Sequence, residues 1–257
     1  MRDLVRRLAP AFAAVQGLLP LALALAVWQL LTSPVSPYFP PPAEWLASLA
    51  RLYGTGRLLP ALASTLGTFA AGLTLSVAAG FLCGTLIGRS RAVRRAFGPL
   101  LEFCRGIPPP VLVPVAVLLL GYSENLKLLN VVWVAIWPVL LNTASAAARI
   151  EPLLLDVGHT FQLDAFERFR KIVAPAIVPE FLTGVRVAIP LAIIITLLVE
   201  MMTALPGIGS MIVASQRQFK SAEVYGLLVL VGLIGFAVNS AFTSIEKGIL
   251  RRWPAAD

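Results

Sequence analysis

The sequence predicts an all-α, polytopic membrane protein, and three observations lead to this fold class. Hydrophobic residues make up 58% of the 257 residues and charged residues only 13%, which is about half the charged share of an ordinary globular domain. The apolar residues are gathered in six stretches, each close to the roughly 20 residues that a bilayer-spanning helix needs. Lys and Arg are concentrated in alternate connections, as in the cytoplasmic loops of membrane proteins.

The six apolar stretches are the candidate transmembrane helices. They run from about Ala13 to Leu31, Leu62 to Gly88, Phe97 to Leu120, Leu128 to Ala147, Phe181 to Met202 and Val224 to Ile245. The first follows a basic start, as in a signal peptide, but it is longer than the usual apolar region of about 7–15 residues. The Pro-rich segment from Pro34 to Pro42 offers no small-residue cleavage site. We therefore expect an uncleaved first helix.

The distribution of Lys and Arg predicts the orientation of these helices. With the N-terminus in the cytoplasm, fourteen of the 21 Lys and Arg residues face inside, five face outside, and Arg105 and Arg186 lie within spans. The five outside are Arg51, Arg57, Lys127, Arg217 and Lys220. This bias predicts a multi-pass protein of the inner (plasma) membrane with both termini in the cytoplasm. It also accounts for the net charge of +8 without nucleic acid as a partner.

Two short segments are predicted to be helical without crossing the membrane. From Pro42 to Tyr53 the apolar residues recur at helical spacing, which favours a short helix on the outer surface over a plain loop. After the fifth span, Gly207 and Gly209 flank Ile208, and a short apolar helix follows. We expect this stretch to re-enter the membrane or to lie across the mouth of a cavity. Its three named residues are candidate gate residues.

The longest cytoplasmic connection runs from Arg149 to Glu180 and is predicted to form a helix–turn–helix. Its two apolar stripes at helical spacing are Leu153, Leu154, Val157 and Phe161, and then Phe166, Phe169, Ile172 and Val173. Pro175 and Pro179 are expected to break the second helix before the fifth span. One face of the connection would rest on the membrane helices, and the other would be free for a soluble partner.

Polar residues inside the spans are candidates for function because charges there are costly. Glu102 and Arg105 lie three apart and are expected to pair on one helix face. Arg186 either joins Glu102 or contacts an anionic substrate. Glu200 either lines an outer gate or, as we favour, hydrogen-bonds the Gly207–Gly209 turn. Roles in linking helices or lining the pathway are open for Asn142, Thr143, Thr196 and Asn239.

Small residues recur at every fourth position of the second span. They are Gly72, Ser76, Gly80, Gly84 and Gly88, and a weaker pair in the sixth span is Gly232 and Gly235. This spacing places them along one helix face, where a neighbouring helix can approach closely. We expect packing contacts at these positions rather than a cofactor-binding loop.

The Arg149–Glu180 connection resembles the signature loop of ABC importer permeases, which reads Glu-Ala-Ala, three residues, Gly, nine residues, Ile, one residue, Leu-Pro. At these positions stand Asp156-Val157-Gly158, Gln162, Ile172 and Ala174-Pro175, with the spacing kept and only Ile172 and Pro175 matching strictly. Other stretches are similar to the sulfonate, taurine and nitrate branch of these permeases. They are Pro40-Pro41-Pro42, Ser64-Thr65-Leu66, Gly88-Arg89-Ser90, Arg105-Gly106-Ile107-Pro108-Pro109, Trp137-Pro138, Glu200 with Gly207-Ile208-Gly209, and Arg251-Arg252-Trp253.

The resemblance implies a single permease domain over residues 1–257, with a core at 62–246 and a coupling loop at 149–180. It implies the channel-forming subunit of an importer that moves a small organic anion of the sulfonate, taurine, nitrate or aromatic-acid type into the cytoplasm. Two permease subunits would form the pathway, two ATPase subunits would dock beneath, and an external substrate-binding protein would deliver substrate. A complete six-helix unit favours a homodimer, whereas the divergent signature favours a second, different permease.

The resemblance also implies which residues couple the permease to the ATPase. These are Asp156, Val157, Gly158, Phe161, Gln162, Phe166, Arg168, Lys171, Ile172 and Pro175. We expect three phenylalanines, Phe161, Phe166 and Phe169, to anchor the loop. The cations Arg168, Arg170 and Lys171 either pair with acidic residues of the ATPase or only satisfy the inside-positive charge bias.

The sequence carries no enzyme motif. It has one histidine, two cysteines spaced for neither a metal site nor a redox pair, and no Gly-Lys pair of the Walker A type. We therefore expect no cofactor in this chain, with ATP and Mg²⁺ on the partner ATPase. A secondary transporter and a membrane component of an energy-coupling-type vitamin uptake system stay as alternatives. An intramembrane enzyme is disfavoured because no metal-ligand cluster or catalytic dyad is present.

Overall fold

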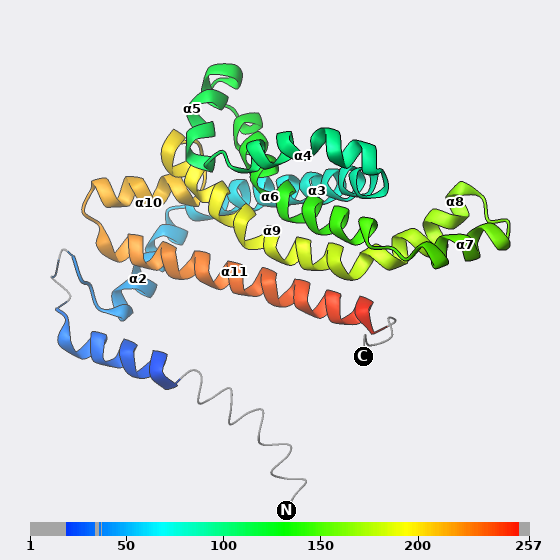
Figure 1. The fold of residues 1–257 in the computed structure, drawn as a ribbon. Helices are drawn as coiled ribbons and strands as arrows, with labels where there is room; N and C mark the ends of the chain where they lie inside the picture. Colours follow the sequence, from blue (N-terminus) through cyan, green and yellow to red (C-terminus); the bar gives the residue numbers. More distant parts are fainter. Residues whose placement is uncertain (1–18, 34–35, 37, 252–257) are drawn as a thin grey trace, which may run out of the picture. The chain divides into compact units, whose positions relative to one another are not determined.

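The computed structural model describes residues 19–33, 36 and 38–251, and these residues form helices and connections without a strand. An apolar helix covers Leu19–Leu31. The later elements are α2 (Pro42–Gly54), α3 (Leu58–Arg89), α4 (Arg91–Arg105), α5 (Pro109–Leu120), α6 (Glu124–Ala148), α7 (Pro152–Thr160), α8 (Ala165–Arg168), the π-helical η1 (Phe169–Val173), α9 (Ala174–Thr203), α10 (Ile208–Arg217) and α11 (Ser221–Leu250) (Figure 1). The all-α fold class is confirmed for this part of the chain.

Four helices are long and apolar enough to cross a membrane, or five if a bent pair counts as one span. The four are Leu58–Arg89, Glu124–Ala148, Ala165–Thr203 and Ser221–Leu250, and the pair is α4 with α5. They correspond to five of the six predicted spans. For the first predicted span, the structure describes the helix Leu19–Leu31, which falls short of this length. Residues 13–18 of that prediction lie outside the described residues, as do Arg2, Arg6, Arg7, Arg252 and Trp253.

The third span is not the continuous helix that the sequence predicted. The helix α4 ends at Arg105, and α5 begins at Pro109 with its axis bent by 94°. The reason is the Ile107-Pro108-Pro109 run, since a proline disfavours the helical conformation of the residue before it. Pro109 then suits the first position of the new helix, where no N–H is needed.

The start of the fifth span also differs from the prediction. Pro175 and Pro179 do not break the helix, because Ala165–Thr203 runs on as one helix of 39 residues. The π-helical turn η1 directly precedes α9 and widens the backbone there, and Pro175 falls in the first turn of α9, where a missing N–H is tolerated. Pro179 lies inside an apolar span, where prolines are tolerated more readily.

The chain divides into two compact units. The larger lies within Pro60–Met211 and Val231–Asp257. Its core is built on α6, which packs along α9 and buries Val131, Ala135 and Val139 completely. The smaller lies within Met1–Leu59 and Ile212–Leu230.

The stripe of small residues on α3 packs against α6, as predicted. A Cβ added at Gly72 would lie 2.4 Å from the Val131 side chain, and one at Gly88 would lie 2.4 Å from the Ala144 carbonyl oxygen. The prediction is wrong for Gly232 on α11, which has no described neighbour within 4 Å of that position. The close approach of α3 and α6 therefore depends on the small size of the residues at these positions of α3.

In the smaller unit, α2 confirms the helix that was predicted for Pro42 to Tyr53. The Trp45 ring stacks on Tyr225 at a centroid distance of 5.2 Å and meets Trp28 edge-on at 5.1 Å. The Ser48 hydroxyl donates a hydrogen bond of 2.8 Å to the Ala222 carbonyl oxygen. These contacts join α2 to the start of α11 within this unit.

Candidate functional site: the Arg149–Glu180 loop and a buried ion-pair cluster

The turn between α7 and α8 keeps a helix-ending geometry that usually takes glycine. The Leu163 N–H donates to the Gly158 carbonyl oxygen at 3.0 Å, and the Gln162 N–H donates to the His159 carbonyl oxygen at 2.9 Å. This pair of bonds is a Schellman motif, whose penultimate residue is left-handed. Gln162 has φ 52° accordingly. Gln162 therefore occupies the signature glycine position, and its left-handed backbone is the conformation that favours glycine.

Replacing Gln162 by glycine is expected to stabilise the protein by about 1 kcal/mol, because glycine adopts the left-handed conformation without the Cβ clash. The same change at Gln216, an exposed residue in the last turn of α10, offers no such gain and should destabilise by up to about 1 kcal/mol through lower helix propensity. Thermal unfolding of the two variants in detergent measures both effects. A fall in melting temperature for Gln162→Gly would contradict the assigned turn.

The loop has two helical arms, the first formed by α7 and the second by α8 with η1, and they are in contact at Gly158. A Cβ on this residue would lie 2.8 Å from the Ile172 side chain, so that α7 rests directly on η1. The second arm begins with a capped turn, in which the Asp164 carboxylate accepts a hydrogen bond of 2.6 Å from the Glu167 N–H. Pro175 is half-buried just beyond this arm. The loop is thus a defined helical structure of its own.

Only one of the three phenylalanines predicted to anchor the loop does so. Phe169 packs beside the buried residues Val173 and Ile177 and meets Phe81 of α3 at a centroid distance of 6.4 Å. The prediction is wrong for Phe161 and Phe166, which are 74% and 69% exposed. The apolar side chains of α7 share this exposure, namely Leu153, Leu154 and Val157. The outer face of the loop is therefore an uncovered apolar surface.

Two of the three cations predicted to meet the ATPase, Arg168 and Lys171, have side-chain partners inside the chain. The Lys171 ammonium pairs with Glu167 at 2.8 Å. The Arg168 guanidinium donates to a ring nitrogen of His159 at 2.7 Å. Arg170 and Asp156 are exposed.

A second constellation surrounds Glu200, near the end of α9. Glu200 and Lys127 are both completely buried, and the Lys127 Nζ lies 3.7 Å from Glu200 Oε1 and 2.8 Å from Glu124 Oε2. The Lys127 ammonium also donates to the Ser64 hydroxyl at 2.8 Å and to the Pro206 carbonyl oxygen at 3.0 Å. One buried cation thus joins α3, α6, α9 and the connection that follows α9.

Glu200 also holds the Gly207–Gly209 turn, through the hydrogen bond that we expected. Its carboxylate accepts from the Gly209 N–H at 3.0 Å and from the Thr65 hydroxyl at 3.0 Å. The Thr65 hydroxyl oxygen in turn accepts from the Ile208 N–H at 2.9 Å. A Cβ on Gly207 would lie 2.0 Å from the Glu200 carboxyl carbon. The turn fits only because its residues leave room for the carboxylate.

Lys127 was missed as a functional residue and was placed among the outward-facing loop cations. Its place in a loop is wrong, since Lys127 lies in the first turn of α6 and is fully buried. The only signal in the sequence was Glu124, three residues earlier on the same helix face. The other partners, such as Ser64 and Glu200, are distant in the chain, so no local pattern could have indicated them.

The remaining intramembrane polar residues are placed as follows. Arg105 and Glu102 pair at 2.5 Å on an exposed face of α4. Arg186 does not join Glu102 but pairs with Glu246 of α11. Asn142 and Thr196 bond backbone carbonyls of their own helices rather than linking helices, as short polar side chains in helices commonly do. Asn239 is exposed, and the buried Thr143 hydroxyl has no partner among the described residues.

No group of three or more His, Cys, Asp and Glu side chains that could hold a metal ion is found in the described part of the chain. The polar constellations are ion pairs and hydrogen bonds. They can fix helices and turns in place, and the apolar surface of the loop can take a partner.

Comparison with solved structures identifies the fold. The chain is similar to one in the crystal structure of an amino acid ABC transporter with histidines, with a TM-score of 0.60 and 14% identity over 79% of this chain and 97% of that chain. This chain therefore shares the fold of that ABC transporter chain. The family model described as binding-protein-dependent transport system inner membrane component matches residues 76–253, and the chain belongs to this family.

Curated relatives cover most of the chain. The nitrate import permease protein NrtB of Leptolyngbya laminosa is 29% identical over 88% of this chain and 84% of its own length. The putative aliphatic sulfonates transport permease protein SsuC of Bacillus subtilis is 24% identical over 92% and 87%. The bicarbonate transport system permease protein CmpB of Synechocystis is 27% identical over 87% and 84%.

Proposed function

We propose that this chain is the channel-forming subunit of an ABC importer for a small anion of the nitrate, sulfonate or bicarbonate type. The three relatives carry names with these substrates, and each substrate is a small anion. Substrate would pass from an external binding protein into the cytoplasm, driven by ATP hydrolysis on separate ATPase subunits that hold ATP and Mg²⁺. Family membership favours this function over a secondary transporter or a vitamin-uptake component.

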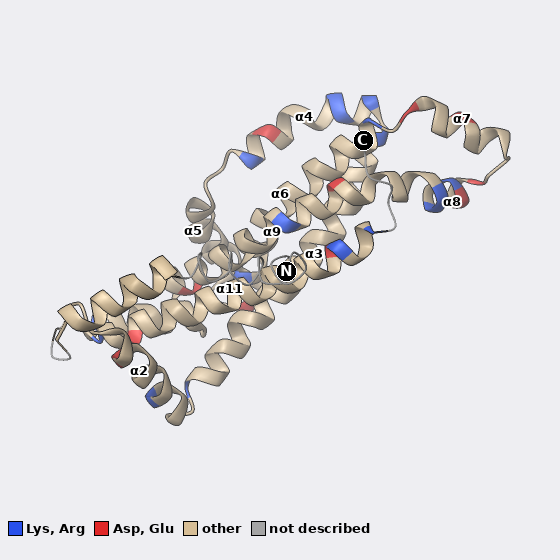
Figure 2. Cartoon of the chain, turned by 90° about the horizontal axis from the view of Figure 1, so that it is seen from below, with Lys and Arg blue, Asp and Glu red and all other residues tan. Residues whose placement is uncertain are grey.

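The chain forms one permease domain in this proposal, with six spans and both termini in the cytoplasm. The distribution of charge supports the orientation. Lys and Arg gather on the first turns of α4 and on α8, which lie at the same end of the larger unit as α7 (Figure 2). Positively charged residues are enriched on the cytoplasmic side of membrane proteins, and so this end would face the cytoplasm.

The observation that carries the proposal is the uncovered apolar face of the coupling loop. The exposed side chains of Leu153, Phe161 and Phe166 project from a short helical hairpin that also carries charged residues. An exposed apolar patch rimmed by polar residues marks an interaction surface. Its occupant in an importer would be the ATPase subunit, and a homodimer of this chain would present two such loops to two ATPase subunits.

The loop is also built to transmit force in this proposal. Phe169 of its second arm packs against Phe81 of α3, and Gly158 of α7 lies in direct contact with Ile172 of η1. A partner that pushed on Phe161 would therefore move the hairpin as one piece. The second arm continues into α9 without a break, so movement of the hairpin would reach the bundle.

Replacing Phe161 by aspartate is expected to lower the amount of co-purified ATPase by about 30-fold, because truncating a central aromatic residue of an interface costs about 2 kcal/mol or more. The measurement is co-expression with the candidate ATPase subunit and affinity purification in detergent. The matched control is Phe219→Asp, at another exposed phenylalanine outside the coupling loop. This control should leave the yield of ATPase unchanged.

Two results would contradict the proposal. Equal losses of ATPase in Phe161→Asp and Phe219→Asp would remove the coupling role of the loop. If the unaltered chain never retains an ATPase, the importer function itself fails, and transport driven by an ion gradient becomes the function to test.

A further inference from the structure

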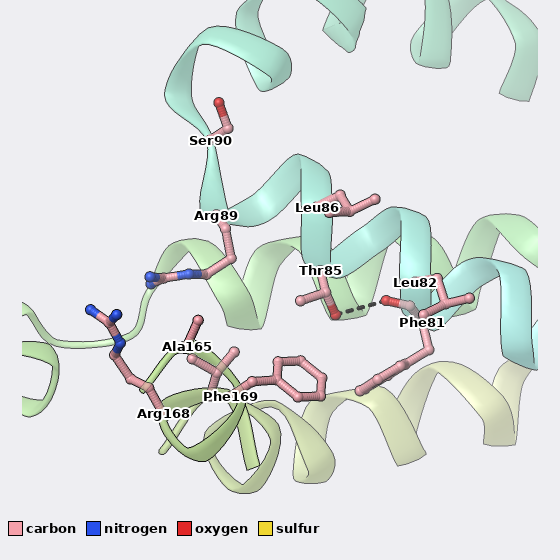
Figure 3. Close-up of a pocket in the computed structure, with 10 residues that line it drawn as sticks. Phe81, Leu82, Thr85, Leu86, Arg89, Ser90, Ala165, Arg168 and Phe169 are labelled. Atoms are coloured by element: carbon pink, nitrogen blue, oxygen red, sulfur yellow. Dashed lines mark hydrogen bonds between the residues drawn. The ribbon is translucent and has the colours of Figure 1, made fainter. Parts of the chain in front are cut away.

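A pocket of about 620 Å³ lies between the end of α3 and the second arm of the coupling loop. Its walls are mainly apolar and include Phe81, Leu82, Leu86, Phe169 and Val173. The one hydroxyl deep in it, on Thr85, is bonded to the Phe81 carbonyl oxygen at 2.7 Å (Figure 3). The volume falls within the range of about 300–1,000 Å³ that is usual for small-molecule sites.

Two arginines stand at one side of this pocket. Arg89, the last residue of α3, and Arg168 of α8 extend their guanidinium groups to the same side (Figure 3). Arg89 has no hydrogen-bond or ion-pair partner in the region that the structure describes, and Arg168 bonds only the ring of His159. The described lining includes no carboxylate, and nearby Glu167 is engaged by Lys171. Two neighbouring cations without a counter-ion favour an anion, and guanidinium groups bind phosphate in a bidentate manner.

The position of the pocket along α3 points to the membrane interface. The helix α3 has 32 residues, or about 48 Å, whereas the hydrocarbon core of a bilayer is about 30 Å thick. Its end at Arg89 therefore reaches the headgroup level. Leu82 and Leu86, two turns and one turn earlier, are 61% and 68% exposed and would meet acyl chains.

We propose that this pocket binds an anionic phospholipid, with its phosphate between Arg89 and Arg168 and one acyl chain along Leu82 and Leu86. A soluble inorganic anion would use the cations but not the apolar wall, and basic pockets between membrane helices are suited to lipid headgroups. The lipid would bridge α3 and α8. Arg168 would then bind the lipid phosphate rather than an acidic residue of the ATPase. The position of the coupling loop would depend on lipid composition.

The test is native mass spectrometry of the full chain in detergent, titrated with phosphatidylglycerol or with phosphatidylcholine of the same acyl chains. We expect phosphatidylglycerol to bind about 10-fold more tightly, and the double variant Arg89→Gln/Arg168→Gln to lose this preference, as expected for charge-assisted hydrogen bonds. Ala165→Trp, which fills the pocket without changing charge, should weaken both lipids. Arg170→Gln removes an exposed cation of the same arm that does not line the pocket, and it should bind like the unaltered chain.

The proposal is overturned if the double variant keeps an undiminished preference for phosphatidylglycerol, or if Arg170→Gln loses the preference equally. It is also overturned if millimolar inorganic phosphate or glycerol phosphate displaces the lipid, which would identify a soluble anion as the ligand. A double variant that binds lipid like the unaltered chain but no longer co-purifies a co-expressed ATPase would place an acidic segment of that partner in the pocket. Lipid binding needs no ATPase, so failure here is distinguishable from failure of the importer proposal.

Discussion

Replacing Lys127 by methionine is expected to destabilise the protein by about 3–5 kcal/mol, because removing one partner of a buried ion pair leaves an uncompensated charge. Methionine keeps most of the side-chain volume, so that the loss reports charge and hydrogen bonds rather than a cavity. The affected partners are the Glu200 carboxylate, the Ser64 hydroxyl and the Pro206 carbonyl oxygen. Thermal unfolding in detergent and the yield of monodisperse protein measure the effect.

The matched control is Lys220→Met, which removes an exposed lysine 3.8 Å from Glu223. An exposed pair contributes about 0–1 kcal/mol, and so this variant should stay close to the unaltered chain. Combining Lys127→Met with Glu200→Gln removes both charges and should recover part of the loss, as a double-mutant cycle would detect. A Lys127→Met protein as stable as the Lys220→Met protein would show that the cluster does not support the fold.

Replacing Gly207 by alanine is expected to destabilise the protein by about 3 kcal/mol, the upper part of the usual range for overpacking. The new Cβ would fall 2.0 Å from the Glu200 carboxyl carbon. The carboxylate would have to move away from the Gly209 N–H and the Thr65 hydroxyl. The turn that precedes α10 would then lose its hydrogen bonds to α3 and α9, which faster proteolysis at this turn would reveal.

The control for Gly207→Ala is Gly56→Ala, at a glycine with φ 71° and no described atom within 4 Å of the added Cβ. This variant carries only the cost of a left-handed backbone, about 1 kcal/mol. The difference between the two variants isolates the contact with Glu200. Equal destabilisation of the two would mean that the carboxylate does not occupy the space beside Gly207.

Much of the bundle follows from local patterns in the sequence. Apolar stretches of about 20 residues predict membrane helices because length and hydropathy are local properties, and α3, α6, α9 and α11 correspond to predicted spans. The every-fourth-residue stripe on α3 predicted a face for close helix contact for the same reason, and the structure shows that α6 is the helix in contact. The hydrogen bond between Glu200 and the Gly207–Gly209 turn was also within reach, because its partners are less than ten residues apart.

Features that depend on distant residues escaped prediction. Lys127 resembles a loop cation in the sequence, because its partners Ser64 and Glu200 are distant in the chain. No periodicity of the sequence predicts that contact. Phe161 reads as an anchoring residue because hydropathy does not tell a buried side chain from an exposed one. The run through Pro175 was read as a break because the rule against proline assumes regular α-helical bonding, whereas a π-helical turn precedes it.

The unbroken helix from Ala165 to Thr203 has a mechanical consequence. Its 39 residues give a rod of about 58 Å, with the coupling hairpin at one end and Glu200, which holds the Gly207–Gly209 turn, close to the other. If this helix pivoted at its middle by about 5° without bending, each end would swing by about 2.5 Å in opposite directions. Such a swing is comparable to the length of a hydrogen bond. A small push on the hairpin would therefore arrive at the far end as a displacement large enough to exchange one set of hydrogen bonds for another.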